Sequence, residues 1–152
     1  MSEPAEYIED LLLSDGKPTD AEWLFVLYRQ SMQPYVEASW GWDEDFQQRG
    51  FIQNLKPTDW RVIWLDEHRI GGFVLNECSD HLRLAMIMLK PEYRRKGLGR
   101  KILTYIQRIA RQKALPVRLN VIKVNPVLPF YTKLGFRQYA EDEAFFRLQW
   151  DA

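Results

Sequence analysis

The sequence predicts one α/β domain, of mixed α+β type, in which a mostly antiparallel sheet contains one parallel β-α-β crossover and carries flanking helices. Residues 82–89 form a nearly continuous apolar run, which is typical of a strand covered on both faces. Residues 97–113 place apolar side chains at helical spacing, and residues 117–124 predict a second buried strand. A strand, a helix and a strand in this order indicate a parallel crossover.

The first strand and the first two helices are predicted from weaker sequence patterns. Residues 7–13 predict a strand, which the turn sequence at 15–18 ends. Residues 43–49 predict a short helix that Gly50 closes. Between them, Asp20 can cap a longer helix, and the apolar side of that helix carries Leu24, Leu27, Tyr28 and Met32.

The remaining elements complete the sheet. Apolar residues on either side of the turn 66–69 predict a hairpin with strands at 61–65 and 70–75. A turn at 76–81 leads back into the strand that begins at Leu82. After the crossover, we expect a helix over 125–134 and two final strands near 136–140 and 144–150.

Composition narrows the class of protein. The 152 residues suit one domain, 1–152, and the 21 basic and 21 acidic residues cancel, so the net charge offers no attraction to nucleic acid or anionic lipid. Cys78 is the single cysteine, which excludes an internal disulfide, and no Cys/His cluster has zinc spacing, so we expect no metal. Without a signal peptide or an apolar stretch of membrane length, a cytoplasmic location is expected.

The segment 93–100 is the most informative part of the chain for function. It lies between the predicted strand 82–89 and the helix that follows, where the first helical turn has unpaired N–H groups and partial positive charge. Two glycines allow the backbone to approach a ligand closely, and basic residues surround them. The segment therefore predicts a diphosphate site formed by Arg94, Arg95, Lys96, Gly97, Leu98, Gly99 and Arg100.

Comparison with the sequence patterns of known phosphate-binding loops indicates which ligand this segment would bind. The Walker pattern is absent, and the dinucleotide pattern G-x-G-x-x-G fails because Ile102 stands at its third glycine. Arg94, Gly97 and Gly99 match the pattern Q/R-x-x-G-x-G/A. In this, the region resembles the acetyl-CoA loop of the GNAT N-acetyltransferase superfamily. A basic helix start in which the glycines only make a turn is the alternative.

A second segment, 125–136, resembles the later GNAT motif N-x-x-A-x-x-F/L-Y-x-K/R-L-G-F. Asn125 suits a helix cap, and Gly135 suits the end of that helix. Pro129 departs from the motif because it stands where a small alanine is usual. The two motifs occur in the family's order, separated by a helix and a strand. The resemblance covers most of the chain, is firmest over 82–136, and implies a GNAT-like acyl-CoA N-acyltransferase fold.

The resemblance implies acetyl-CoA as co-substrate and direct attack of an amine on its thioester. Backbone groups at Ile87, Met88 and Leu89 are expected to pair with the cofactor, since the family separates the two parallel strands there. Asn125 and Tyr131 are expected to face the cofactor. Tyr131 is the expected donor to the departing thiolate, with a packed aromatic as the alternative.

Proton removal from the amine has less support in the sequence. The strand 82–89 offers no carboxylate, so Glu77 is the first choice of base, directly or through water. The alternative is a solvated turn carboxylate. His81 is the second choice, and His68 is expected to be exposed in its hairpin turn.

The substrate side is expected between the first two helices, where the family places its acceptor. Trp40, Trp42 and Glu44 suit a cationic amine, because tryptophan faces and carboxylates attract cations. The alternative is that the tryptophans pack the loop onto the sheet and the acidic residues cap a helix.

The sequence therefore predicts an N-acetyltransferase acting on a primary amine of a small molecule. One alternative is an enzyme for a protein amine, either a lysine or an N-terminus. Another is an acyl-CoA-binding module without catalysis. Neither nucleic acid nor membrane is an expected partner. A homodimer formed through an edge strand stays an open alternative, for which no particular residue speaks.

Overall fold

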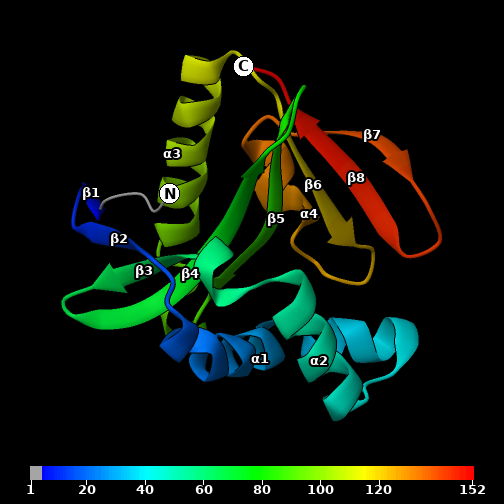
Figure 1. Cartoon of the computed structure of the whole chain (residues 1–152). Coiled ribbons are helices and arrows are strands. Elements are labelled where there is room, and N and C mark those ends of the chain that lie inside the picture. The colour runs from blue at the N-terminus through cyan, green and yellow to red at the C-terminus, as the bar shows by residue number, and fades with distance from the viewer. Residues whose placement is uncertain (1–4) are drawn as a thin grey trace.

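The computed structural model describes residues 5–152, which form one eight-stranded sheet with helices on both faces (Figure 1). The strands follow the order β1-β2-β3-β4-β5-β6-β8-β7, and only β5 and β6 pair in parallel. The fold class expected from the sequence is thus confirmed. The strands are β1 (Glu6–Ile8), β2 (Leu11–Asp15), β3 (Arg61–Leu65), β4 (His68–Glu77), β5 (Leu82–Leu89), β6 (Val117–Ile122), β7 (Arg137–Glu141) and β8 (Phe145–Trp150).

The helices lie in two groups. In Figure 1, α1 and α2 lie together at one end of the view, and α3 stands upright beside the sheet. The α-helices are α1 (Ala21–Trp40), α2 (Glu44–Asn54), α3 (Leu98–Lys113) and α4 (Leu128–Lys133). Short 3-10 helices are η1 (Pro18–Asp20), η2 (Pro57–Asp59) and η3 (Pro91–Tyr93). The strand predicted at 82–89 and the helix predicted at 97–113 are confirmed to within one residue.

Several expected boundaries were wrong, three of them by more than two residues, and the strands expected at 70–75 and 117–124 span His68–Glu77 and Val117–Ile122. Residues 7–13 form parts of two strands, because Glu9 and Asp10 make a two-residue turn that pairs Ile8 with Leu11. The second helix continues through Gly50 to Asn54. Packing explains this extension: the Phe51 ring lies 4.9 Å from the ring of Tyr28 and 5.6 Å from that of Phe25, measured between centroids. Such contacts outweigh the roughly 1 kcal/mol that glycine costs inside a helix.

The third correction concerns α4, which begins at Leu128 rather than at 125. Pro129 is the cause. A proline inside a helix lacks the N–H that bonds four residues back, and its ring clashes with that carbonyl. With the helix starting at Leu128, Pro129 falls in the first turn, where no such bond is needed. Asn125 is consequently a loop residue and not the helix cap.

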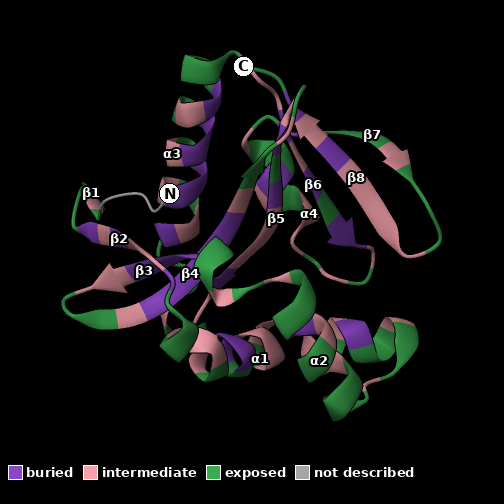
Figure 2. Cartoon of the chain, viewed as in Figure 1, coloured by how far each residue is buried: buried purple, intermediate pink, exposed green. Residues whose placement is uncertain are grey.

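Two apolar clusters hold the helices to the sheet. Figure 2 shows buried residues along the side of α3 that faces the sheet. These are Leu98, Ile102, Leu103, Ile106 and Ala110, and they pack with strand residues such as Leu82, Leu84 and Leu119. A second cluster beneath α1 and α2 contains Leu24, Phe25, Leu27, Phe51, Trp60 and Met88. The sheet is therefore covered on both faces toward the end of β5, where Met88 packs beneath α1 and α2.

The outer strand β7 departs from regular pairing. Its register with β8 shifts between Gln138 and Ala140, which leaves Tyr139 as an extra residue in a β-bulge. Tyr139 is exposed, and the guanidinium carbon of Arg118 lies 5.5 Å from its ring centroid. At the opposite end of the sheet, β1 is only three residues long.

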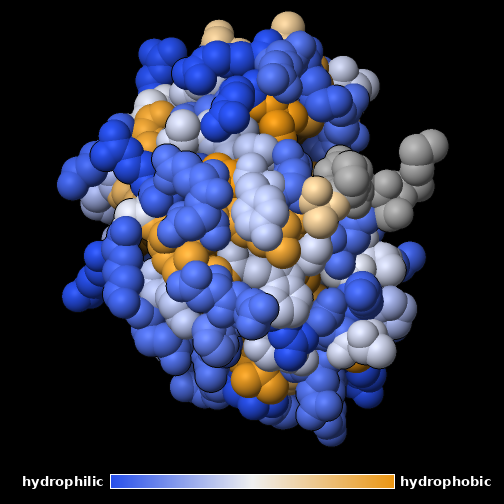
Figure 3. All heavy atoms as spheres, turned by 90° about the vertical axis from the view of Figure 1, so that its left-hand side faces the viewer, coloured by the Kyte–Doolittle hydropathy of each residue, from blue (hydrophilic) through white to orange (hydrophobic). Residues whose placement is uncertain are grey.

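The outer surface is mostly polar. The face in Figure 3 carries mainly hydrophilic residues, with small apolar areas between them. Over residues 5–152, no helix combines the length and apolar character needed to cross a membrane. The same residues contain no group of three or more His, Cys, Asp or Glu side chains placed to hold a metal ion.

Candidate active site

A cleft opens where the two parallel strands separate. The ladder between β5 and β6 contains only the pairs Leu82–Val117 and Arg83–Arg118, as the resemblance implied. Beyond these pairs lies a cavity of about 360 Å³. Its lining residues come from four parts of the fold: α1 (Tyr28, Met32, Val36, Trp40), β5 (Arg83, Leu84, Ala85, Met86, Ile87), β6 (Leu119, Asn120, Val121, Ile122), and the later segments (Asn125, Val127, Tyr131, Phe145).

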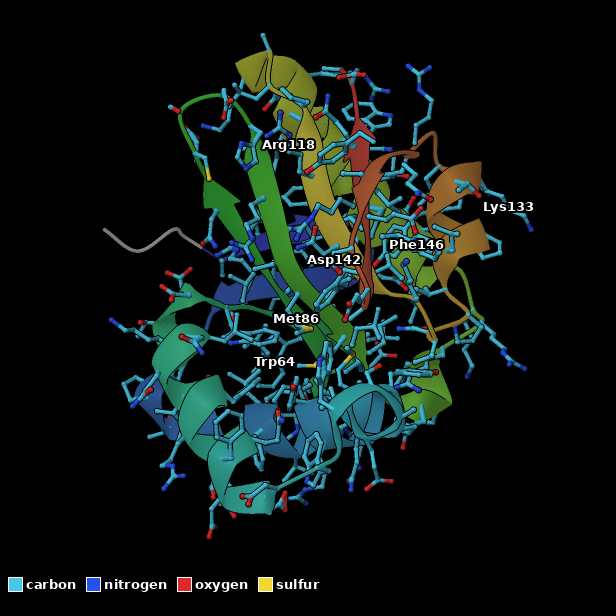
Figure 4. The ribbon with its side chains drawn as sticks, turned by 90° about the vertical axis from the view of Figure 1, so that its right-hand side faces the viewer. Trp64, Met86, Arg118, Lys133, Asp142 and Phe146 are labelled. Carbon is cyan, nitrogen blue, oxygen red and sulfur yellow. The ribbon has the colours of Figure 1, made fainter. Side chains whose placement is uncertain are left out.

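A β-bulge in β5 shapes this cleft. Val74 pairs with Met86 and Leu75 with Leu84, so Ala85 is an extra residue in the strand. The bulge changes which side chains face α3: Leu84 belongs to the cluster beneath that helix, whereas Met86 packs toward α1 and α2. Figure 4 shows Met86 near the α1 end of the separated strands and Arg118 near their paired end.

Tyr131 lines the cleft and has only 7% of its surface exposed. Its ring packs edge-on against Phe130 and Phe136, at centroid distances of 5.1 and 5.7 Å. Burial raises the pKa of the Tyr131 phenol, because the phenolate would be poorly solvated there. Within the described part of the chain its hydroxyl has no hydrogen-bond partner, so the O–H is available to a ligand.

The other residues expected at the cofactor divide into two groups. Ile87 and Asn125 line the cleft with Tyr131. Met88 is buried beneath α1 and α2, and Leu89 packs toward α3, so their side chains do not line it. Any contact that Met88 and Leu89 make with a ligand in the cleft is therefore through the backbone, which is the role the resemblance implied.

The loop before α3 has the features of an anion site. Gly97 has φ +79° and no cap from any side chain, and the first helical hydrogen bond runs from Lys101 N to Gly97 O at 3.2 Å. The N–H groups of the first turn therefore point outward without helical partners. No acidic residue lies in this turn to occupy them. Arg95, Lys96 and Arg100 are exposed and form no ion pair with a described residue.

Arg94 is held by hydrogen bonds to two neighbouring elements. Its Nε donates to Leu89 O at 2.9 Å, and its Nη2 donates to Ser31 Oγ at 3.0 Å. The guanidinium thus ties the loop to the end of β5 and to α1. Arg94 acts as a positioning residue for the loop, while its neighbours supply the unpaired charge.

Glu77 does not lie in the cleft. Its carboxylate forms an ion pair with Lys113 of α3 at 2.8 Å and lines a separate hollow beside that helix. His81, the second choice, contacts Asp80 at 2.7 Å, and this hydrogen bond is the main reason that the pKa of Asp80 is lowered. His68 is exposed, as expected. The described residues that line the cleft include no carboxylate at all.

The expected substrate residues are also divided. Trp40 lines the cleft, and its ring contacts Phe145 at a centroid distance of 5.5 Å. Trp42 instead stacks on Tyr28 at 6.0 Å and donates from Nε1 to Glu44 Oε1 at 3.3 Å. Glu44 also pairs with Arg29 at 3.0 Å, so its charge is compensated outside the cleft.

Sequence reasoning missed several residues of this site, above all Arg83 and Phe145. Both lie on strands that were predicted, but their shared face depends on register across β5, β6 and β8, which the sequence does not show. One signal was present. Arg83 is a charged residue between Leu82 and Leu84 in an otherwise apolar strand, and it is exposed in the structure. The expectation that this strand is covered on both faces along its whole length was therefore wrong at its start.

Comparison with known proteins gives a consistent result. Residues 58–138, more than half of the chain, match the sequence model of the family described as acetyltransferase (GNAT) domain. The PaiA N-acetyltransferase of Thermoplasma acidophilum, solved with coenzyme A, has a TM-score of 0.75 and 22% identity, covering 95% of this chain and 100% of that one. The ribosomal-protein-S18-alanine N-acetyltransferase of Escherichia coli has a TM-score of 0.70 and 16% identity, covering 93% of each chain. An acetyltransferase of Thermus thermophilus has a TM-score of 0.71 and 16% identity, covering 97% of this chain and 100% of that one.

Proposed function

Because this chain belongs to the GNAT family of acetyltransferases and is an acetyl-CoA-dependent N-acetyltransferase, we propose that its acceptor is the primary amine of a small molecule. The amine attacks the thioester directly while both substrates are bound. The observation that carries this proposal is the cleft between β5 and β6, which is lined by Tyr131 and by residues of α1.

The residues present fit acetyl-CoA. The first-turn amides of α3 and the unpaired cations Arg95, Lys96 and Arg100 suit its diphosphate. The separated strands leave the backbone of β5 beyond Arg83 without a ladder partner in β6, so its peptide groups are free to pair with an extended ligand arm. Bound acetyl-CoA supplies an activated acyl group.

Two groups of the protein would then assist acyl transfer. A peptide N–H near Met86 or Ile87 polarises the carbonyl and stabilises the oxyanion. The Tyr131 hydroxyl donates to the departing thiolate. Since burial raises the pKa of this phenol far above that of a thiol, near ~8.5, the hydroxyl stabilises the thiolate mainly by a hydrogen bond and not by full proton transfer.

The amine itself must lose a proton. An alkyl amine with a pKa near ~10.4 is less than about 0.1% neutral at pH 7. Among residues 5–152 no carboxylate lines the cleft, and Glu77 pairs with Lys113 elsewhere. We infer that the proton leaves to solvent water, so that kcat/KM rises with pH as the neutral amine becomes more abundant.

The shape of the cleft supports a small acceptor. Met32, Val36 and Trp40 form one stripe of α1 along it, and the Trp40 ring contacts the ring of Phe145, another lining residue. A protein substrate needs an open groove for an extended segment, and this contact narrows that approach.

Release of free thiol from acetyl-CoA tests the proposal. Wild type and Tyr131→Phe are compared across a panel of small amines and a panel of lysine and N-terminal peptides. We expect acceptor-dependent release with small amines and a kcat about 10- to 100-fold lower in Tyr131→Phe. Release with peptides alone would show that the acceptor is a protein. Tight binding of acetyl-CoA without release for any acceptor would instead show a binding module.

A further inference from the structure

The described residues that line the cleft carry positive charge and no negative charge. Of the described residues that line it, Arg83 alone carries a charge, and the others are apolar, aromatic or amide side chains. Within residues 5–152 the Arg83 guanidinium forms neither an ion pair nor a hydrogen bond to a side chain. An acceptor whose body is cationic would meet this arginine without any carboxylate to offset the repulsion.

The position of Arg83 follows from the strand. Leu82 and Leu84 face the cluster beneath α3, so the side chain of Arg83 points to the opposite face, the one that α1 covers. Arg118 is its register partner on β6, which places a second cation beside it on the same face. Arg118 donates to Gln149 Oε1 at 2.7 Å, and the nearby carboxylate of Asp80, which is also in contact with His81, offsets part of its charge. Arg83 is therefore the cation on which the inference depends.

This cation is not placed for the diphosphate of acetyl-CoA. Arg83 lies near the start of β5, and the anion loop follows the end of that strand at Leu89. Six residues of strand separate them by roughly 20 Å. Met86, where the acyl group is expected, lies between the two positions.

We propose that the acceptor is a primary amine that also carries a carboxylate, and that Arg83 binds this carboxylate while the amine points toward the backbone at Met86. The proposal rests on the function proposed above. Arg83 and Met86 are three positions apart, which is roughly 10 Å along a strand. The long side chain of Arg83 can reach over much of this distance, so the amine and the carboxylate of the acceptor should be only a few bonds apart. The apolar residues Met32, Val36 and Phe145 suit a hydrocarbon body between or beside these two groups.

Matched pairs of amines test this assignment. Phenylalanine, leucine and 4-aminobutanoate are each compared with the corresponding carboxamide in wild type, Arg83→Gln, Arg83→Lys and Arg137→Gln. Arg137 is the control, because it is an arginine with 85% of its side chain exposed on β7. The ratio of kcat/KM between carboxylate and carboxamide is the readout, since comparing this ratio among variants cancels differences in amine pKa.

We expect this ratio to fall at least about tenfold in Arg83→Gln, the size of effect typical of a charge-assisted hydrogen bond. Arg83→Lys should recover part of it, Arg137→Gln should match wild type, and the KM for acetyl-CoA should not change. Acetylation of these amines with the same ratio in wild type and Arg83→Gln would overturn the inference and leave the proposed function intact.

If no amine of the panel is acetylated, the function proposed above fails and binding decides the inference separately. Calorimetry then measures 4-aminobutanoate, leucine and phenylalanine binding to the protein with coenzyme A. Heat that disappears in Arg83→Gln supports the carboxylate site, whereas the absence of binding for all three overturns it.

Discussion

Arg94 and Ser31 lie 63 positions apart in the sequence, and the Arg94 Nη2 donates to Ser31 Oγ at 3.0 Å. Together with the bond from Arg94 Nε to Leu89 O at 2.9 Å, this contact fixes the loop before α3 to both β5 and α1. The loop that we propose to bind the diphosphate is therefore held by the first helix, which also lines the cleft.

Removing this anchor should weaken the binding of acetyl-CoA. We expect Arg94→Ala to raise its Kd about tenfold, because two hydrogen bonds worth roughly 0.5–1.5 kcal/mol each are lost and the loop becomes less ordered. Ser31→Ala should raise the Kd about two- to fivefold. Calorimetry on both single variants and the double variant measures the coupling: effects smaller than additive indicate a shared contact, and strict additivity would contradict it.

Gly97 has a partial control in Gly41. Both have positive φ, +79° and +80°, and a Cβ added at either would meet nothing within 4 Å. Their ψ angles differ. Gly97, at ψ 2°, lies in the left-handed helical region, where alanine should lower the free energy of unfolding by about 1–2 kcal/mol. Gly41, at ψ 171°, lies in a region almost exclusive to glycine, so alanine there should lower it by at least as much. Gly97→Asp should in addition abolish measurable acetyl-CoA binding, since its carboxylate would occupy the first-turn amides. Normal acetyl-CoA affinity in Gly97→Asp would refute the anion site.

The buried phenol of Tyr131 predicts a specific response to alkaline pH. Its pKa is raised in the folded protein, so below about pH 10 both the folded and the unfolded states keep the proton and stability is unaffected. Above that pH the unfolded state ionises first, and the free energy of unfolding falls by up to about 1.4 kcal/mol per pH unit. Urea unfolding from pH 9 to 11 should show a shallower fall in Tyr131→Phe. Tyr139→Phe, on an exposed tyrosine, serves as the control, and equal slopes in all three proteins would be the contrary result.

Glu77 provides a direct test of how the amine loses its proton. Because its carboxylate pairs with Lys113 outside the cleft, Glu77→Gln should change kcat/KM by less than about twofold and stability by no more than about 1 kcal/mol. The pH profile of kcat/KM should rise with the same slope in both proteins. A large loss of activity in Glu77→Gln, together with a flatter pH profile of kcat/KM, would show that Glu77 acts as the base.

Substitution of Trp40 should affect substrate binding, whereas substitution of Trp42 should affect stability. Trp40→Ala removes a lining residue that is 55% exposed, so the KM for the amine should rise while the midpoint of thermal unfolding hardly changes. Trp42→Ala removes the stack on Tyr28 and should lower the free energy of unfolding by about 1–3 kcal/mol. Equal effects of the two substitutions on the amine KM would show that this distinction is wrong.

The sequence predicted most of the fold because the decisive signals were local. The apolar run from Leu82 and the glycines before α3 fix their elements without reference to the rest of the chain. The hairpin between β3 and β4 was likewise readable, and its turn residues Asp66 and Glu67 both have positive φ. Where the outcome depended on distant packing, as for α2 at Gly50, the prediction failed.

The site was predictable only in part for a similar reason. Gly97 and Tyr131 belong to contiguous motifs, and the structure places one in the anion loop and the other in the cleft. Glu77 was chosen for its closeness in sequence to the strand, which does not determine the face on which its carboxylate lies. The neighbours of Arg83 are set by register and by the bulge at Ala85, neither of which a single sequence shows.

The bulge at Tyr139 also bears on how the protein behaves at high concentration. A regular outer strand offers a row of unpaired main-chain groups to which another polypeptide can add. Here β7 is interrupted and has charged ends at Arg137 and Glu141, and the opposite border, β1, is too short to template a partner. Over the described residues, both borders of the sheet are therefore poor templates for an added strand.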